Sequence, residues 1–195
     1  MVADGKRGDV PVSAEAYARG LLGSTPTPWG EVEGLGADAV TANPLLGADS
    51  LEPMLAAAER CGAGVFTLVR TSNEGAADLL DLELAGGAPL HERIATMVND
   101  AAPRLAGAGG LSGAGAVVGA TRPEFIARLR ELMPAAIFLL PGVGAQGGDA
   151  TALGAAFAPG PAAALVTASR SIVGAEDPAA AAEELREVVW AASGG

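Results

Sequence analysis

The chain has 195 residues, half of them apolar and 4% aromatic, which is enough to bury a sizeable core. Its formal net charge of -11 at pH 7 argues against nucleic acid and anionic membranes as partners, because both bind basic surfaces. No apolar run approaches the roughly 20 residues of a membrane span, and no signal pattern opens the sequence. We therefore predict a single globular domain over residues 1–195, located in the cytoplasm.

The first stretch is a short apolar run, Met1–Ala3, followed by the charged sequence Asp4-Gly-Lys-Arg-Gly-Asp9. Alternate side chains of an extended strand share a face, so we expect Asp4 and Lys6 to point the same way where this strand ends. An acid beside an ammonium group is often only a solvated ion pair. The same arrangement also suits a pair of reactive groups.

Helices and strands alternate along the rest of the chain. The patterns predict helices over 13–22, with Ser13 as N-cap, and over 50–60, 89–102, 123–132, 150–157 and 177–192, with Asp177 as N-cap. Buried strands are predicted over 37–46, 64–69, 114–120, 135–140 and 162–168, and a loop over 23–36. Apolar strands that alternate with helices form parallel sheets covered on both faces, so the pattern leaves a doubly wound sheet or a closed barrel.

One cysteine and one histidine are present, which excludes an internal disulfide, a zinc site built on cysteines and a histidine cluster. We expect Cys61 to be a small buried helix residue. His91 is expected at the surface near the start of a helix. No metal site and no cofactor site are predicted.

Polar or glycine-rich sequences follow three of the later strands. They are Thr71-Ser72-Asn73, Pro141-Gly-Val-Gly-Ala-Gln-Gly-Gly148 and Ser169-Arg170. Small residues whose backbone N–H groups surround an anion suit a phosphate group, and glutamine and arginine side chains add to this. A glycine-rich turn taken alone is equally compatible with a flexible connection.

The run Asp4-x-Lys6-x-x-Asp9-Val10 closely resembles the signature of the orotidine 5'-phosphate decarboxylase family, in the form D-x-K-R-G-D-I of a large bacterial branch. Later motifs agree in order and wording over nearly the whole chain: Asp38-Ala-Val-Thr-x-Asn-Pro44, Thr71-Ser72-Asn73, Pro141 to Gly148, and Ser169-Arg-Ser-Ile172. The resemblance implies an α/β fold, a (β/α)8 TIM barrel shortened at its N-terminus to about six units, the third to the eighth.

By this resemblance the chain is a lyase that decarboxylates orotidine 5'-phosphate to UMP in de novo pyrimidine biosynthesis, without a cofactor. Lys6 is the expected proton donor to C6 of the pyrimidine, where its charge also stabilises the developing carbanion. Asp4 is expected beside the substrate carboxylate, where it disfavours the ground state. Asp9 is expected to reach the site of a neighbouring subunit, which implies a homodimer.

The resemblance also implies which residues bind the nucleotide. Gln146 and Arg170 would hold the 5'-phosphate, and Pro141 would contact the pyrimidine side. A glycine-rich loop after strand seven and an arginine after strand eight form the usual phosphate-binding site of such barrels.

The pyrimidine ring and the ribose are expected to meet serines. Ser72 would hydrogen bond to the ring, with Thr71 or Asn73 as alternatives. Ser13 stands where the family has a threonine that faces the ribose or the phosphate.

The chain departs from the family at its beginning. The family has a lysine on its second strand and a ribose-binding aspartate on its first strand, and this sequence contains neither. We therefore expect the isolated chain to be impaired and to associate through open sheet edges. Two other functions stay open. One is a non-catalytic remnant that binds phosphate, and the other is a magnesium-dependent decarboxylase of sugar-phosphate keto acids from a related barrel group.

Overall fold

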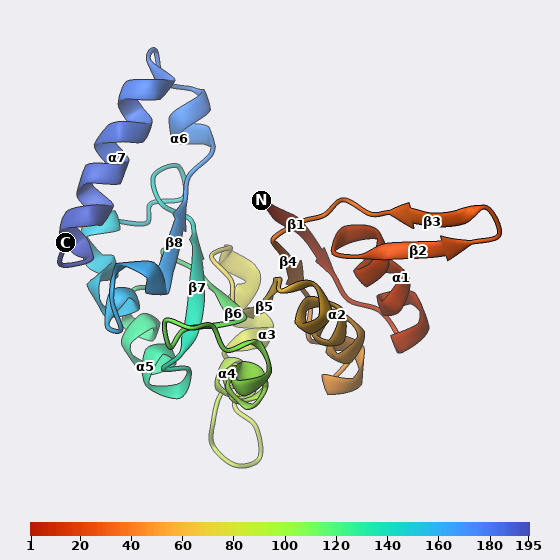
Figure 1. Cartoon of the computed structure of the whole chain (residues 1–195). Helices are drawn as coiled ribbons and strands as arrows, with labels where there is room; N and C mark the ends of the chain where they lie inside the picture. The colour runs from red at the N-terminus through yellow and green to blue at the C-terminus, as the bar shows by residue number, and fades with distance from the viewer.

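A computed structural model describes all residues, 1–195, and contains one main sheet of six parallel strands (Figure 1). The strands, in their order across the sheet, are β1 (Val2–Arg7), β4 (Ala39–Ala42), β5 (Gly64–Arg70), β6 (Ser112–Val118), β7 (Ala136–Pro141) and β8 (Ala164–Thr167). The sheet curls without closing, so β1 and β8 are its two edges. The predicted α/β fold, built from six units of a barrel, is confirmed.

Helices connect the strands and pack on one face of the sheet (Figure 1). The longer ones are α1 (Pro11–Leu21), α2 (Ala48–Cys61), α4 (Leu90–Ala101), α5 (Glu124–Leu132) and α7 (Pro178–Ala192). Shorter pieces are α3 (Ala77–Leu80), α6 (Arg170–Val173) and the 3-10 helices η1 (Glu74–Ala76), η2 (Ala102–Leu105), η3 (Ala150–Phe157) and η4 (Pro161–Ala163). None of the helices has both the length and the apolar character needed to cross a membrane.

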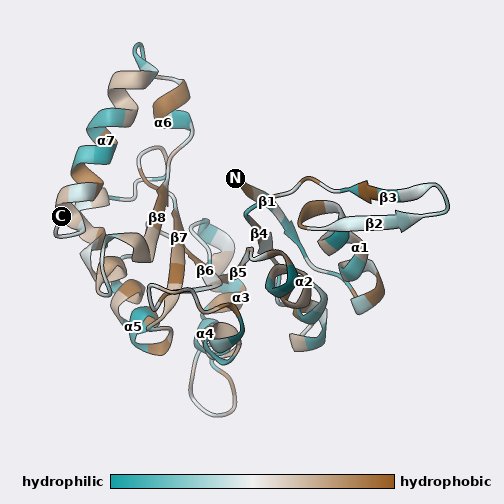
Figure 2. Cartoon of the chain, viewed as in Figure 1, coloured by the Kyte–Doolittle hydropathy of each residue, from teal (hydrophilic) through white to brown (hydrophobic).

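The core lies between the sheet and these helices. Its largest part joins side chains of β5 to β7 with α4, α5 and η3, and includes Val69, Ile94, Phe138 and Leu153. Figure 2 shows β7 and β8 as mostly hydrophobic, whereas α7 carries hydrophilic segments. A second cluster joins β4 to α1 and α2. The helices therefore fix the sheet from one side and leave the strand ends free for polar groups.

Helix ends differ in part from the prediction. The Asp177 carboxylate accepts hydrogen bonds from the N–H groups of Ala179 and Ala180, both at 3.0 Å, so its predicted role as an N-cap is confirmed. The predicted N-cap role of Ser13 is wrong. Helix α1 begins at Pro11, because proline fits the first helical turn, and Ser13 is its third residue.

The predicted loop over 23–36 contains an antiparallel hairpin of β2 (Ser24–Thr27) and β3 (Gly30–Glu33), which extends away from the main sheet (Figure 1). All four residues of β3 are exposed, and Trp29 in the turn is 92% exposed. Because neither strand buries a full face, the sequence carries no apolar alternation that would reveal them.

The predicted exposure of two residues is also wrong, although Cys61 lies in helix α2 and His91 near the start of helix α4, as predicted. Cys61 is exposed, because it is the last residue of α2 and faces away from the core. His91 is buried at 3% exposure in α4, where its Nδ1 lies 2.8 Å from the Leu80 carbonyl oxygen and its ring packs edge-on against Phe125. These contacts satisfy the imidazole inside the protein, which makes its burial possible.

Candidate functional site

The six parallel strands end at one rim of the sheet, and the polar residues singled out in the sequence lie along that rim. Lys6 is at the end of β1, Ser72 follows β5, Pro141 ends β7, and Arg170 follows β8. Parallel barrels carry their chemistry at this carboxyl-terminal rim because their strand-to-helix loops converge there. The candidate site therefore runs along this rim from β1 to β8.

Asp4 and Lys6 form an ion pair on β1, with Lys6 Nζ 2.5 Å from Asp4 Oδ2. The Thr41 hydroxyl of β4 donates to Asp4 Oδ1 at 2.9 Å. Partial burial alone would raise the pKa of Asp4, but the hydrogen bonds from Lys6 and Thr41, together with the Lys6 charge, keep this pKa below its ordinary value. Asp4 is thus held as a carboxylate against an ammonium group.

Lys6 is the only lysine of the chain and the only non-glycine residue with a positive φ, 49°. A left-handed backbone costs a residue with a Cβ roughly 1–2 kcal/mol, so neighbouring contacts must hold it. One such contact is the hydrogen bond from the Lys6 N–H to Thr41 Oγ1, at 2.8 Å.

Asp9 lies in the turn that follows β1. Its Oδ1 accepts from the N–H of Val10 at 2.8 Å, and it forms no ion pair within the chain. Gly8 beside it has to be a glycine, because an added Cβ would lie 2.5 Å from the Asn43 carbonyl oxygen. This contact sets the path of the turn that carries Asp9.

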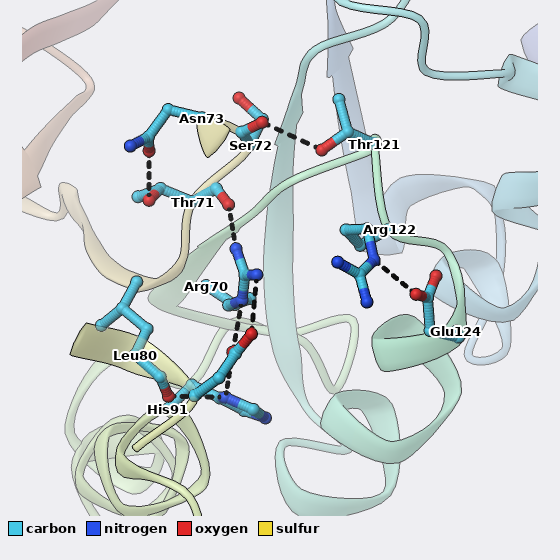
Figure 3. A network of polar contacts seen from close by, with 10 residues as sticks. Arg70, Thr71, Ser72, Asn73, Leu80, His91, Thr121, Arg122 and Glu124 are labelled. Atoms are coloured by element: carbon cyan, nitrogen blue, oxygen red, sulfur yellow. Dashed lines mark hydrogen bonds and ion pairs between the residues drawn. The ribbon is translucent and has the colours of Figure 1, made fainter. Parts of the chain in front are cut away.

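The segment Thr71–Asn73 is held between the ends of β5, β6 and β7. An added Cβ on Gly119 would lie 2.6 Å from Ser72 Cα, and one on Gly142 would lie 3.0 Å from Ser72 Cβ. The Thr121 hydroxyl donates to the Ser72 carbonyl oxygen at 3.0 Å (Figure 3). Ser72 is therefore fixed by close backbone packing as well as by a hydrogen bond.

Arg70, at the end of β5, supports the same segment from inside. This side chain is buried, and its Nη1 donates to the Thr71 carbonyl oxygen at 2.7 Å (Figure 3). Its Nε and Nη2 bind the Asp81 carboxylate at 2.7 and 3.0 Å. These bonds keep the pKa of Asp81 below its ordinary value.

Two hollows open along this part of the rim and share Gln146. The larger, about 410 Å³, has a wholly polar lining: Arg70, Ser72, Asn73, Glu74, Thr121, Arg122 and Gln146. The smaller, about 140 Å³, is lined by residues 141–143, 145–146 and 167–170. The predicted binding residues Ser72, Pro141, Gln146 and Arg170 thus come together, whereas Ser13 lines neither hollow.

Some N–H groups of the glycine-rich loop, residues 141–148, already form hydrogen bonds within the loop. The N–H groups of Gly144, Gly147 and Gly148 donate to carbonyl oxygens inside the loop. The N–H groups of Ala145 and Gln146 have no backbone partner. Arg170 is exposed and forms no ion pair. Ala145, Gln146 and Arg170 all line the smaller hollow, so hydrogen-bond donors and a positive charge lie around the same space.

Sequence reasoning missed Thr41, Thr121 and Arg122 at this rim. Thr41 was visible as a polar residue inside an apolar strand, which is the signal that could have identified it. Thr121 and Arg122 lie in the loop after β6, where polar residues are common and carry no distinct signal. No group of three or more histidine, cysteine, aspartate and glutamate side chains has metal-binding geometry.

A larger hollow of about 670 Å³ lies at the opposite end of the strands. Its lining is mostly apolar and includes Phe66, Ile137 and Leu165. Its lining includes the ion pairs of the Met1 amino group with Asp38 and of Arg104 with Glu59, but none of the predicted site residues, so we place the candidate site at the polar rim.

Comparison with known proteins matches residues 1–185 to the model of the orotidine 5'-phosphate decarboxylase / HUMPS family. A protein named orotidine 5'-phosphate decarboxylase from Rhodopirellula baltica is 43% identical over 176 residues, which cover 89% of this chain and 56% of the relative. Its namesake from Haloarcula marismortui is 45% identical over 198 residues, covering 100% of this chain and 64% of the relative. The chain thus spans less than two thirds of the length of these relatives.

Solved structures give the same result for the fold. The OMP decarboxylase of Leishmania donovani superposes with a TM-score of 0.74 at 34% identity, covering 100% of this chain and 68% of that one. The UMP synthase of the same organism superposes with a TM-score of 0.74 at 36% identity, covering 96% of this chain and 38% of that one. Both comparisons extend over almost every element of the open sheet.

Proposed function

Because the chain belongs to the orotidine 5'-phosphate decarboxylase / HUMPS family, we propose that its rim is the site that decarboxylates orotidine 5'-phosphate to UMP in pyrimidine biosynthesis. The observation that carries this proposal is the contact between the Lys6 ammonium and the Asp4 carboxylate on the rim that also carries Gln146 and Arg170. A reactive acid–ammonium pair and an anion-binding loop are the two parts that the reaction requires.

The proposed reaction breaks the bond between C6 of the pyrimidine and its carboxylate carbon. Carbon dioxide leaves, the electron pair stays on C6, and Lys6 Nζ delivers the proton that completes UMP. The Lys6 charge stabilises the carbanion that forms before this transfer. Fixed charges lower the barrier to decarboxylation most when they lie where negative charge develops in the transition state. Asp4 pairs with the Lys6 ammonium and disfavours the substrate carboxylate beside it.

The proposed substrate is a small nucleotide whose 5'-phosphate binds at the smaller hollow. Arg170 supplies the positive charge, and the Gln146 side chain and the N–H groups of Ala145 and Gln146 donate to the phosphate oxygens. Pro141 contacts the pyrimidine side, and Ser72 binds the ring from the larger hollow. Ser13 contributes only if the bound ligand reaches α1.

The proposal includes a homodimer in the cytoplasm, in which Asp9 enters the neighbouring site. The absence of an ion pair for Asp9 within the chain is consistent with a partner outside it. Exchange of subunits between an inactive Asp9→Ala chain and an inactive Lys6→Ala chain should restore activity if the site is shared.

Turnover and product binding together test the proposal. Lys6→Ala should lower kcat by several orders of magnitude, while Arg170→Ala should mainly raise KM and weaken UMP binding in calorimetry. Arg60→Ala removes another exposed arginine, at the end of α2, and should change neither. Equal kinetic effects of Lys6→Ala and Arg170→Ala would contradict the assigned roles.

The two alternatives predict different outcomes of the same assays. A metal-dependent decarboxylase of sugar-phosphate keto acids would lose turnover in EDTA and regain it with Mg²⁺. A phosphate-binding remnant would bind UMP without turnover. The proposed decarboxylase converts orotidine 5'-phosphate in the presence of EDTA.

A further inference from the structure

We propose that Thr41 is a positioning residue that holds Asp4 and Lys6 in their reactive arrangement. Its hydroxyl bonds to both residues, with distances of 2.9 Å to Asp4 Oδ1 and 2.8 Å to the Lys6 nitrogen. The inference deepens the function proposed above and rests on it for its kinetic consequence.

The pairing of β1 with β4 is interrupted where the reactive residues lie. Ala3 pairs with Val40 and Arg7 pairs with Ala42, so four steps along β1 (3 to 7) match two along β4 (40 to 42). The intervening residues of β1 therefore bulge out of the ladder opposite Thr41. Bulges of this kind redirect side chains and are frequent beside active sites.

Thr41 occupies the position where a regular ladder would offer a carbonyl oxygen. The Lys6 N–H donates to its hydroxyl oxygen, and the hydroxyl proton goes to the Asp4 carboxylate. One hydroxyl can make both bonds because it has one proton and two lone pairs. The oxygen therefore couples the backbone of one reactive residue to the side chain of the other.

Two further observations support a positioning role. Thr41 is 0% exposed, so water does not replace its hydroxyl without a rearrangement. Lys6 has the left-handed backbone with φ 49°, which persists only where surrounding contacts over-determine it. Lys6 is also the only charged group that forms an ion pair with Asp4. The Asp4 carboxylate is therefore neutralised only when these two side chains are aligned.

The test uses two substitutions at Thr41 and one control. Thr41→Val keeps the shape and removes the hydroxyl, while Thr41→Ser keeps the hydroxyl. Thr67→Val is the matched control, because Thr67 is a buried threonine on the neighbouring strand β5 that forms no side-chain hydrogen bond. Asp4 is followed by NMR titration of its carboxyl carbon, and turnover by release of carbon dioxide.

We expect Thr41→Val to raise the pKa of Asp4 and to lower kcat by about 10- to 100-fold with little change in KM, as for a misplaced reactive group. Thr41→Ser and Thr67→Val should leave both quantities near their original values. An unchanged Asp4 titration in Thr41→Val, or the same effects in Thr67→Val, would overturn the proposal.

The readouts separate this inference from the proposed function. If the unmodified chain lacks turnover, the proposed function fails, and the Asp4 titration still decides whether Thr41 positions the pair. If Thr41→Val does not fold, the unmodified chain provides the test. The chemical shift of its Thr41 methyl group should change over the same pH range as that of the Asp4 carboxyl carbon. A Thr41 resonance that does not follow Asp4 would overturn the proposal.

Discussion

The Arg70 guanidinium binds the Asp81 carboxylate through two hydrogen bonds, of 2.7 and 3.0 Å, while its third nitrogen holds the Thr71 carbonyl oxygen. Figure 3 shows this contact directly beneath the Thr71–Asn73 segment. The Arg70 side chain is 4% exposed, so water does not substitute for either partner. This ion pair between the buried Arg70 and the partly exposed Asp81, together with Ser72 packed against Gly119, makes one wall of the polar hollow rigid.

Arg70→Met should destabilise the chain and weaken UMP binding. Removing Arg70 leaves the partly exposed Asp81 without its main partner, which costs about 1–3 kcal/mol in the free energy of unfolding. The Thr71 carbonyl is freed at the same time. Urea denaturation and calorimetry measure the two effects.

Arg130→Met is the control for this prediction. Arg130 is also buried, but it donates to carbonyl oxygens at the amino ends of β7 and β8, including those of Ala136 and Ala163. We expect a comparable loss of stability with UMP affinity unchanged in the molecules that remain folded. Equal losses of affinity would show that Arg70 acts only through overall stability.

Acid should remove the contribution of Asp81 to stability. The unfolded carboxyl titrates near its ordinary pKa of 3.8, and the hydrogen bonds from Arg70 keep the folded pKa below that. Between these two pKa values the unfolded chain binds more protons, so the stabilisation is complete above pH 3.8 and is lost as the pH falls through the folded pKa. Asp81→Asn should therefore be less stable than the unmodified chain at neutral pH, with a difference that shrinks in acid. A difference independent of pH would contradict this assignment.

Gly119→Ala should displace Ser72. The new Cβ would lie 2.6 Å from Ser72 Cα, which forces backbone to move and costs about 1–3 kcal/mol. We expect weaker UMP binding and a lower urea midpoint. Gly86→Ala adds the same methyl group where nothing lies within 4 Å and should have neither effect.

The open edges of the sheet should cause self-association. Strands β1 and β8 each lack a partner on one side, and Leu165 of β8 is 44% exposed. Unpaired strand edges beside apolar side chains pair readily with other chains. Sedimentation should give a mass above the 19.1 kDa of the monomer, and Leu165→Lys should reduce it. A stable monomer at high concentration would contradict the prediction.

Local features of the site followed from the sequence because they depend on short-range geometry. The period of two predicted that Asp4 and Lys6 share a face, and the structure brings them into contact, but through a bulge and the left-handed backbone of Lys6. The strand and helix alternation likewise predicted six units, because each unit carries its own apolar pattern. The start of α7 followed from Asp177 and its local capping bond.

The amino-acid sequence by itself determined the order of strands and helices and the polar segments that follow them. Only the tertiary structure decided which distant residues complete the site. Thr41 reaches Asp4 because β1 and β4 pair with a bulge, and Asp81 meets both Arg70 and His91 because the segment after β5 folds back over α4. Such contacts depend on strand register and on helix packing, which join residues far apart in the chain and leave no periodic signal in either segment alone.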